Sequence, residues 1–403
     1  MISFEKLFDA DPEAEYFPGY DCKGEYNGVS FDNIKTVTYR GADYEGRATR
    51  VFAHIGFPEN AKEPLPAVVL IHGGGGHPDD MWIKKWNDEG YAAIAMDTIG
   101  FFPSKPVCLY EGSGASDMVH DLAEPFYRPG HTVLPENRHM SDSYRKIEDQ
   151  WIYQAVAAVI AANNLLRADT RIDPDRIGIC GISWGGIVAS VAIGFDLRFA
   201  FAVPIYGSGY TACGLSDLDR IFKTPGVQKW YPEKRFHKVK IPVMWLCWND
   251  DCCFSLNSNS MSYEDTKDGN PDTCLSMIHD MGHSHSCAYT PKESYWFANR
   301  VLSGTPVPTV SAQYSGNVVK YSCSEKPISV RLFYITEEMS YSRREKYGLH
   351  NTFMQQEWQI VDLCPDEESA ILPEYTVGKY LEFTLADGVV LTTPYHEFKN
   401  PVA

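Results

Sequence analysis

A serine lies in a pattern that can make it a nucleophile. The sequence GISWG at residues 181–185 has the form G-x-S-x-G, with an apolar run before it and an apolar stretch after it. Small residues two before and two after the serine allow a tight turn from strand to helix, which holds the serine hydroxyl exposed at the strand end. The start of a helix also favours a developing negative charge. The pattern predicts that Ser183 is a nucleophile, and the alternative is an ordinary glycine-rich turn.

A second glycine-rich segment could stabilise an oxyanion. The sequence HGGGGH at residues 72–77 directly follows the apolar run AVVLI. Acyl transfer passes through a tetrahedral oxyanion that needs backbone N–H donors, and such loops often supply one of them. We expect the donors to be the N–H of Trp184 and that of Gly74 or Gly75. A phosphate-binding loop is the alternative, but the Lys-Ser/Thr pair and the dinucleotide spacing that it requires are missing.

An acid and a histidine follow Ser183 in the order that this chemistry requires. The apolar run VMWLCW ends in NDD at residues 249–251, and the run LSMIHDM is followed by GHSH at residues 282–285. A histidine takes the serine proton and returns it to the leaving group, while the acid fixes the imidazole tautomer. Each segment offers two candidates, and solvated loop residues are the alternative. The preferred pair is Asp251 and His283, with Asp250 and His285 in reserve.

Apolar runs alternate with helical stretches over the first three quarters of the chain. Runs without a polar face are typical of strands buried on both sides. The segment 149–166 has the apolar spacing of a helix. This alternation predicts a mostly parallel, doubly wound α/β sheet. The expected strands are residues 48–55, 67–71, 92–96, 177–180, 199–206, 243–248 and 275–278.

The pattern changes near residue 304, where short alternating runs replace the helical spacing. We expect an irregular lead-in over residues 1–34, a catalytic domain over 35–304 and a small, all-β, sandwich-like domain over 305–403. The sequence ADG at 386–388 predicts a hairpin turn. Structural support or a dimer contact is the expected role of the last domain, and sugar binding is the alternative. Its expected strands are residues 318–322, 329–334, 358–363, 380–385 and 389–393.

Composition excludes several classes of protein. The 403 residues carry a formal net charge of −17, which argues against nucleic acid and anionic membranes as partners. No run approaches the ~20 apolar residues of a membrane span, and the acidic N-terminal sequence does not read as a signal peptide. Eleven cysteines, an odd number, follow no framework spacing. We therefore expect free thiols and a cytoplasmic location.

A zinc site is the main alternative use of the residues around the acid and the histidine. Cysteines at 247, 252, 253 and 287 lie near His283 and His285 in the sequence. Their spacing matches no closed zinc pattern, and the acid–histidine assignment uses the same loops. We expect no metal and no cofactor.

The order of these motifs resembles a known family, the acetyl xylan esterase-like α/β-hydrolases, which are relatives of dienelactone hydrolases and prolyl oligopeptidases. The resemblance covers roughly residues 50 to 303, through HGGGG, GYAAIAMDTIG, DPDRIGICGISWGG, FAVPIYG, the Trp-rich run before NDD, and MGHSH. In such relatives the acid lies in a segment similar to W-x-N-G-x-N-D-F, which implies Asp251. The histidine lies in one similar to M-P-H-G-H, which implies His283.

Three departures from the family pattern bear on the substrate pocket. Gly282 stands in place of the proline, Trp248 stands where a glycine is usual, and cysteines follow the acid at 252 and 253. The resemblance implies an α/β-hydrolase fold and a serine carboxylic ester hydrolase that deacetylates acylated carbohydrates. A peptidase or amidase with the same triad is one alternative. An inactive binding or assembly protein of the same fold is another. We expect a small-molecule or oligosaccharide ester as substrate, and a homo-oligomer is left open.

Overall fold

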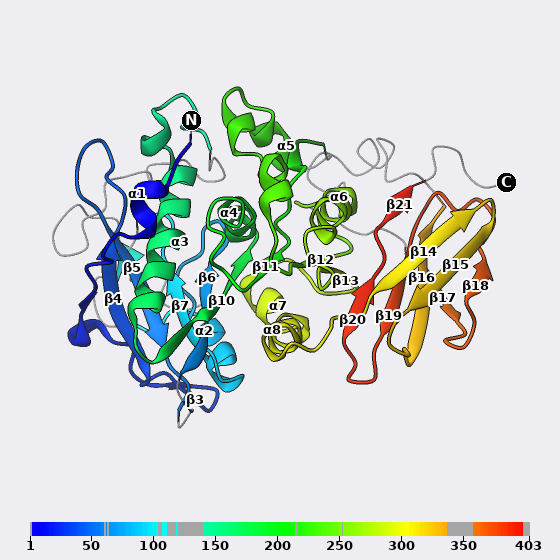
Figure 1. Ribbon diagram of the computed structural model, residues 1–403, viewed down its shortest axis with the longest axis horizontal. Helices are drawn as coiled ribbons and strands as arrows, with labels where there is room; N and C mark the ends of the chain where they lie inside the picture. The colour runs from blue at the N-terminus through cyan, green and yellow to red at the C-terminus, as the bar shows by residue number, and fades with distance from the viewer. Residues whose placement is uncertain are drawn as a thin grey trace. The chain divides into compact units, whose positions relative to one another are not determined.

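The computed structural model describes residues 2–59, 62, 64–100, 102–103, 107–110, 118–119, 140–213, 217–251, 253–336 and 358–397 (Figure 1). The chain forms two compact units. The first comprises Met1–Gly207 and Ile221–Arg235, and the second comprises Ser208–Arg220 and Phe236–Ala403.

The strands of the first unit follow the order β1-β4-β5-β7-β6-β10-β11. Neighbours pair antiparallel from β1 to β7 and parallel from β7 to β11. Parallel neighbours require crossover connections, and helices supply these here. The strands are β1 (Glu15–Tyr16), β4 (Ile34–Arg40), β5 (Arg50–Gly56), β6 (Leu65–Ile71), β7 (Ala92–Met96), β10 (Ile172–Ile182) and β11 (Phe201–Ile205), with a separate pair β8 (Phe102–Pro103) and β9 (Met118–Val119).

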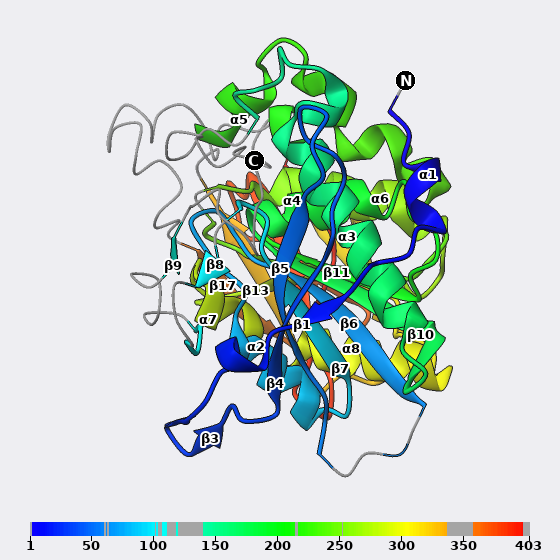
Figure 2. The same ribbon diagram turned by 90° about the vertical axis from the view of Figure 1, so that its left-hand side faces the viewer.

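Helices of the first unit pack on strands whose residues are buried on both faces (Figure 2). The helix α2 (Asp80–Asp88) packs against β5 and β7, α3 (Trp151–Ala168) against β6 and β10, and α4 (Trp184–Ala192) against β10 and β11. Burial covers every residue of β7 and all of α3 from its first residue to Leu166. Such runs lack a polar face because both sides exclude water.

The lead-in to the first unit contains short regular elements. These are α1 (Glu5–Phe8), the 3-10 helix η1 (Pro18–Tyr20) and the hairpin of β2 (Glu25–Tyr26) with β3 (Val29–Ser30). The ring of Phe4 stacks on Tyr153 of α3, with centroids 4.6 Å apart. The start of this segment, with α1, therefore packs against α3.

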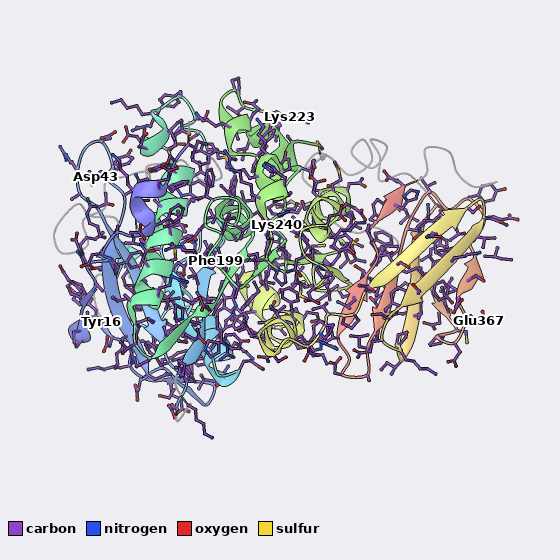
Figure 3. All side chains as sticks on the ribbon, viewed as in Figure 1. Tyr16, Asp43, Phe199, Lys223, Lys240 and Glu367 are labelled. Carbon is purple, nitrogen blue, oxygen red and sulfur yellow. A yellow bond between two sulfur atoms is a disulfide. The ribbon has the colours of Figure 1, made fainter. Side chains whose placement is uncertain are left out.

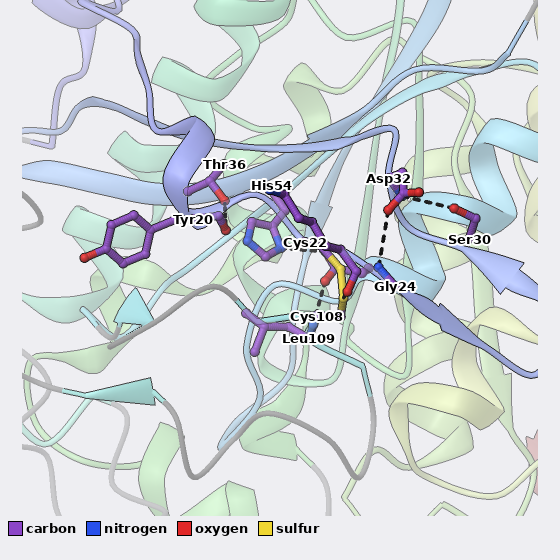
Figure 4. The surroundings of a disulfide bond; sticks show 11 residues. Tyr20, Cys22, Gly24, Ser30, Asp32, Thr36, His54, Cys108 and Leu109 are labelled. Atoms are coloured by element: carbon purple, nitrogen blue, oxygen red, sulfur yellow. Dashed lines mark hydrogen bonds and ion pairs between the residues drawn. A yellow bond between two sulfur atoms is a disulfide. The ribbon is translucent and has the colours of Figure 1, made fainter.

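A disulfide joins Cys22 to Cys108 (Figure 4). The expectation that all cysteines are free is wrong for this pair. The two residues are 86 positions apart, so their proximity arises from the tertiary fold and not from a local spacing. Next to Cys108, the N–H of Leu109 donates to Asp80 Oδ2 at 2.5 Å. The other oxygen of Asp80 lies 2.5 Å from Nδ1 of the buried His54.

The second unit contains the parallel strands β12 (Met244–Trp248) and β13 (Cys274–Ile278). Ser255 begins α6 because its hydroxyl accepts from the N–H of Ser258. The helices with residues in this unit are α5 (Asp217–Phe222), α6 (Leu256–Lys267), α7 (His285–Tyr289) and α8 (Glu293–Ser303). Within the described residues, the other 3-10 helices are η3 (Ile147–Asp149), η4 (Thr211–Cys213), η5 (Val227–Trp230) and η6 (Pro232–Lys238).

Two antiparallel sheets follow within the second unit. One has the order β14-β15-β18, and the other has the order β17-β16-β19-β20 with β21 paired to β19. Side chains from both, such as Val319 and Leu381, share one hydrophobic core, which is the packing of a small sandwich. Strand bounds are β14 (Val310–Ser315), β15 (Val318–Cys323), β16 (Ser329–Ile335), β17 (Gln359–Leu363), β18 (Ser369–Ile371), β19 (Gly378–Thr384), β20 (Val390–Thr392) and β21 (His396–Glu397).

The predicted fold class is confirmed: a mostly parallel sheet with helices precedes C-terminal antiparallel sheets. The predicted hairpin at residues 386–388 joins β19 to β20, and Gly388 adopts a φ of 77° there. Acidic residues such as Asp43 and Glu367 are exposed (Figure 3). Among the helices that the structure describes, none is both long enough and apolar enough to cross a membrane.

Candidate active site

Ser183 occupies a sharp turn between β10 and α4. Its backbone has φ 55° and ψ −116°, a conformation that costs a non-glycine residue free energy and clusters at functional sites. The N–H of Ser183 donates to the carbonyl of Ile205 on β11 at 2.9 Å, and its carbonyl accepts from Ile187. Its neighbours 179–182 and 184–192 are buried, whereas Ser183 is partly exposed. The turn therefore presents this side chain at the carboxyl end of the strands.

Glycines around the turn allow contacts that a side chain would block. A Cβ atom on Gly181 would lie 2.2 Å from the carbonyl oxygen of Gly185, and one on Gly185 would lie 2.1 Å from that of Ile71. One on Gly186 would lie 2.8 Å from Cα of Gly207. All three obstacles are backbone atoms, so they cannot move aside as a flexible side chain would. The spacing in GISWG follows from this close approach.

The glycine-rich segment after β6 forms a turn fixed by a histidine. Gly76 N–H donates to the carbonyl of Gly73 at 3.1 Å, and Gly75 adopts a φ of 68° that favours glycine. The N–H of Thr98 donates to Nε2 of His72 at 3.1 Å. His72 therefore carries its proton on Nδ1, which donates to the same Gly73 carbonyl at 2.7 Å.

The turn leaves two backbone donors available. The residues Gly74 and Gly75 are exposed, and within the described part of the chain their N–H groups make no hydrogen bond. One of these two residues is the oxyanion donor that the sequence predicts from this loop. The N–H of Trp184, the other expected donor, belongs to the first residue of α4, where the helix dipole favours negative charge.

A chain of contacts connects the turn to the start of α4. The carbonyl of Thr98, which follows β7, accepts from the indole N–H of Trp151 at 2.8 Å. The ring of Trp151 meets that of Trp184 edge to face, with centroids 5.7 Å apart. Sequence reasoning missed His72 and Thr98 as parts of this arrangement. Their positions in the sequence could have indicated this role. His72 is the first residue after the buried strand β6, and Thr98 is the second residue after the buried strand β7.

In the second unit, the loops after β12 and β13 bring an acid and a histidine together. Oδ2 of Asp251 lies 2.6 Å from Nδ1 of His283. The other oxygen, Oδ1, accepts from the N–H groups of Cys253 at 2.7 Å and Phe254 at 2.9 Å. The Asp251 side chain is fully buried, whereas that of His283 is 20% exposed. This pairing fixes the imidazole tautomer, so that Nε2 is the ring nitrogen that can accept a proton.

The reserve candidates occupy different environments. The Oδ1 atom of Asp250 accepts from the indole N–H of Trp358 at 2.9 Å. His285 is the first residue of α7, and the preceding Ser284 caps that helix by accepting from Cys287 N–H at 3.1 Å. Asp251 and His283 are thus the members of their segments that meet. Ser183 belongs to the first unit and this pair to the second.

Three groups at the acid could in principle share a metal. Ligand atoms of Asp251, Cys253 and His283 lie within 4.8 Å of one another. However, Asp251 and His283 already hydrogen-bond each other, and the other oxygen of Asp251 accepts from two backbone N–H groups. Burial, together with the nearby Asp251 carboxylate, raises the pKa of the Cys247 thiol well above its usual value. Cys247 therefore stays protonated and packs in β12 instead of serving as a thiolate ligand. Cys252 lies outside the described residues.

A pocket of about 550 Å³ lies beside the histidine loop. Residues on both sides of His283 line it, including His279, Ser286 and Lys292. His283 itself is not part of the lining.

Comparisons with known proteins agree with this fold. A sequence model of the dienelactone hydrolase family matches residues 51–301. An acetyl xylan esterase from Paenibacillus sp. R4 superposes with a TM-score of 0.50 and 16% identity, over 74% of this chain and 91% of that chain. Acetyl xylan esterase 1 from Thermoanaerobacterium sp. JW/SL YS485 gives 0.48 and 13%, over 74% and 92%.

An acylaminoacyl peptidase from Pyrococcus horikoshii superposes with a TM-score of 0.46 and 17% identity, over 69% of this chain and 43% of that chain. No curated protein sequence matches the chain. The identity to the Paenibacillus enzyme is low, so that superposition reports the fold alone. The family match spans more than half of the chain, from β5 to α8. The protein therefore belongs to the dienelactone hydrolase family.

Proposed function

We propose that the protein is a serine hydrolase of carboxylic esters, in which Ser183, His283 and Asp251 act as a catalytic triad. The contact of 2.6 Å between Asp251 and His283 carries the proposal. A buried carboxylate that holds Nδ1 of a partly exposed imidazole leaves Nε2 to act as a general base. The strained turn at Ser183 and the family match support the choice of nucleophile.

The proposed reaction has two halves. Nε2 of His283 takes the proton of the Ser183 hydroxyl as Oγ attacks the ester carbonyl, and the resulting imidazolium is stabilised by Asp251. The same proton then goes to the departing alcohol, and the acyl group stays on Ser183. Water, activated by His283, attacks the acyl-enzyme and releases the carboxylic acid. The step requires no cofactor.

The oxyanion of each tetrahedral intermediate would be held by backbone N–H groups. The candidates are Trp184, at the start of α4, and Gly74 or Gly75, two exposed residues whose N–H groups make no hydrogen bond among the described residues. Such donors act best when they are rigid before the reaction begins. His72 supplies that rigidity on the loop side, because its Nδ1–H is bonded to Gly73.

Acylated carbohydrates, and acetyl groups in particular, are the proposed substrate class. The support is the resemblance to acetyl xylan esterase-like hydrolases and the superposition on the Paenibacillus enzyme. The alternative is a peptidase or amidase with the same triad, and the experiment below distinguishes it from an acyl-sugar esterase.

The test compares wild type with Ser183→Ala on p-nitrophenyl acetate, butyrate and octanoate. Removal of the triad nucleophile lowers turnover on the order of 10⁶-fold in the serine protease subtilisin, and we expect a loss of that kind here. Acetylated xylo-oligosaccharides and aminoacyl arylamides then separate an acyl-sugar esterase from a peptidase. A fluorophosphonate should label wild type at Ser183 and leave the variant unlabelled. Equal turnover by the two proteins, or a folded wild type inert to the fluorophosphonate, would overturn the proposal.

A further inference from the structure

The C-terminal sheets are bonded to the strand that leads to His283. The Ser276 hydroxyl of β13 donates to the carbonyl of Val390 on β20 at 2.7 Å. The Thr392 hydroxyl of β20 accepts from Met277 N–H at 3.2 Å and donates to the carbonyl of Leu275 at 3.4 Å. A strand at the edge of a sheet has unpaired backbone groups that can bind other chains. Thr392 of β20 bonds such backbone groups of β13.

The same sheets contact the loop that carries Asp251. Trp358, which precedes β17, donates its indole N–H to Asp250 at 2.9 Å. The hydroxyl of Tyr380 on β19 accepts from the side-chain amide of Asn249 at 3.2 Å. The two residues directly before the candidate catalytic acid are thus each bonded to an aromatic side chain of the C-terminal sheets.

These aromatic side chains belong to one cluster. The ring of Tyr380 stacks on Phe333, with centroids 4.9 Å apart, and meets the edge of Trp358 at 5.3 Å. Phe333 also meets the ring of His279, with centroids 5.4 Å apart. His279 in turn lies 3.1 Å from the Asn249 amide. The cluster therefore contacts the loops after both β12 and β13.

We propose that Trp358 and Tyr380 are positioning residues of the active site, and that the C-terminal sheets hold the Asn249–Asp251 loop so that Asp251 faces His283. Asp250 and Asp251 are adjacent carboxyl groups with different partners. The bond to Trp358 fixes the side chain of Asp250, and through the shared backbone it limits where the adjacent Asp251 carboxylate can lie. The inference rests on the proposed function, because it acts through Asp251.

The decisive variant is Trp358→Phe, which removes the donor and keeps an aromatic ring. We expect kcat to fall by roughly 10- to 100-fold, the range for a small misplacement of a catalytic group, with KM changed by less than about threefold. Asp250→Ala, which removes the acceptor, should give a similar loss, and the double variant should be no worse than either single one. If Trp358→Phe folds poorly, Asp250→Ala tests the same hydrogen bond from the acceptor side.

A matched control is Trp245→Phe. In wild type, the indole N–H of Trp245 donates to Thr266 at 2.9 Å. The variant therefore also loses one buried indole hydrogen bond in the same unit, but that bond does not involve residues 249–251. Its melting temperature should fall while kcat of the folded protein stays within about twofold of wild type.

An Asp251→Asn background separates positioning from general damage. There, Trp358→Phe should cost less than about twofold further, because the acid through which Trp358 acts is already lost. If Trp358→Phe leaves kcat unchanged, or lowers it equally in both backgrounds, the inference is wrong. If Asp251→Asn itself leaves kcat unchanged, the proposed function is wrong instead.

Discussion

Nδ1 of His283 lies 2.6 Å from Oδ2 of Asp251. The residue directly before Asp251 is a second aspartate, Asp250. The N–H groups of Cys253 and Phe254 donate to Oδ1 of Asp251. The carboxylate therefore has three hydrogen-bond partners, which fix its orientation. A buried acid in this position stabilises an imidazolium without taking its proton.

This contact predicts unequal effects of two conservative substitutions. Asp251→Asn should lower kcat by about 10⁴-fold, as the same change does in the serine protease template, because an amide favours the wrong imidazole tautomer. Asp250→Asn should cost less than about tenfold, since an amide oxygen can still accept from Trp358. Steady-state kinetics on p-nitrophenyl acetate measures both. A larger loss in Asp250→Asn would make the reserve acid the catalytic one.

The sequence identified the segments of the site and left one reserve candidate in each, while the family resemblance favoured Asp251 and His283. Both aspartates follow the same buried strand, and both histidines follow the next. The choice depends on Trp358, which lies 108 positions from Asp250, and on the turn geometry at residues 251–254. Long-range contacts of this kind leave no spacing signal. The glycines of GISWG are different, because their role depends on steric limits within a few residues and could be read from the pattern.

The same distinction explains the disulfide and the C-terminal strands. Cys22 and Cys108 meet only through the fold of the first unit, so counting cysteines favoured free thiols. Strands β15, β16 and β19 were predicted from alternation, whereas β14, which alternates partly buried and exposed residues, was missed. A strand with one solvated face carries a weak hydrophobic signal.

The strain at the serine turn predicts the outcome of Gly185→Ala. The added Cβ would lie 2.1 Å from the carbonyl oxygen of Ile71, so β6 and α4 must separate, and kcat should fall by roughly 100-fold or more. Steady-state kinetics measures kcat, fluorophosphonate labelling measures the reactivity of Ser183, and thermal melting measures the stability of the variant. Gly19→Ala is the matched control, because a Cβ there meets nothing within 4 Å. Wild-type labelling in Gly185→Ala would contradict the close packing of the turn.

The disulfide predicts a stability effect that depends on reductant. Cross-linking residues 86 positions apart lowers the entropy of the unfolded chain by an amount worth on the order of 4–5 kcal/mol in the chain-entropy treatment. Reduction, or Cys22→Ser with Cys108→Ser, should therefore lower the melting temperature. The double variant should no longer respond to reductant. A response equal to that of wild type would assign the effect to other cysteines.

A buried lysine predicts a pH-dependent stability. Lys379 is fully buried, with its ammonium 4.7 Å from the ring centre of Tyr314. Burial lowers the pKa of Lys379 from 10.5 to about 7, although the Glu397 carboxylate partly offsets this. Between about pH 7 and 10.5 the unfolded chain binds this proton and the folded protein releases it, so stability rises with pH across that window.

Lys379→Met should remove this dependence. The variant should melt at a higher temperature than wild type near pH 7, because no buried ammonium must be discharged on folding, and the difference should shrink as the pH approaches 10.5. Melting curves from pH 6.5 to 10 measure it. Lys320→Met, which changes an exposed lysine on β15, is the control and should show no such trend. A constant difference between wild type and Lys379→Met at every pH would mean that Lys379 keeps its proton in the folded protein, held by the Tyr314 ring and the Glu397 carboxylate.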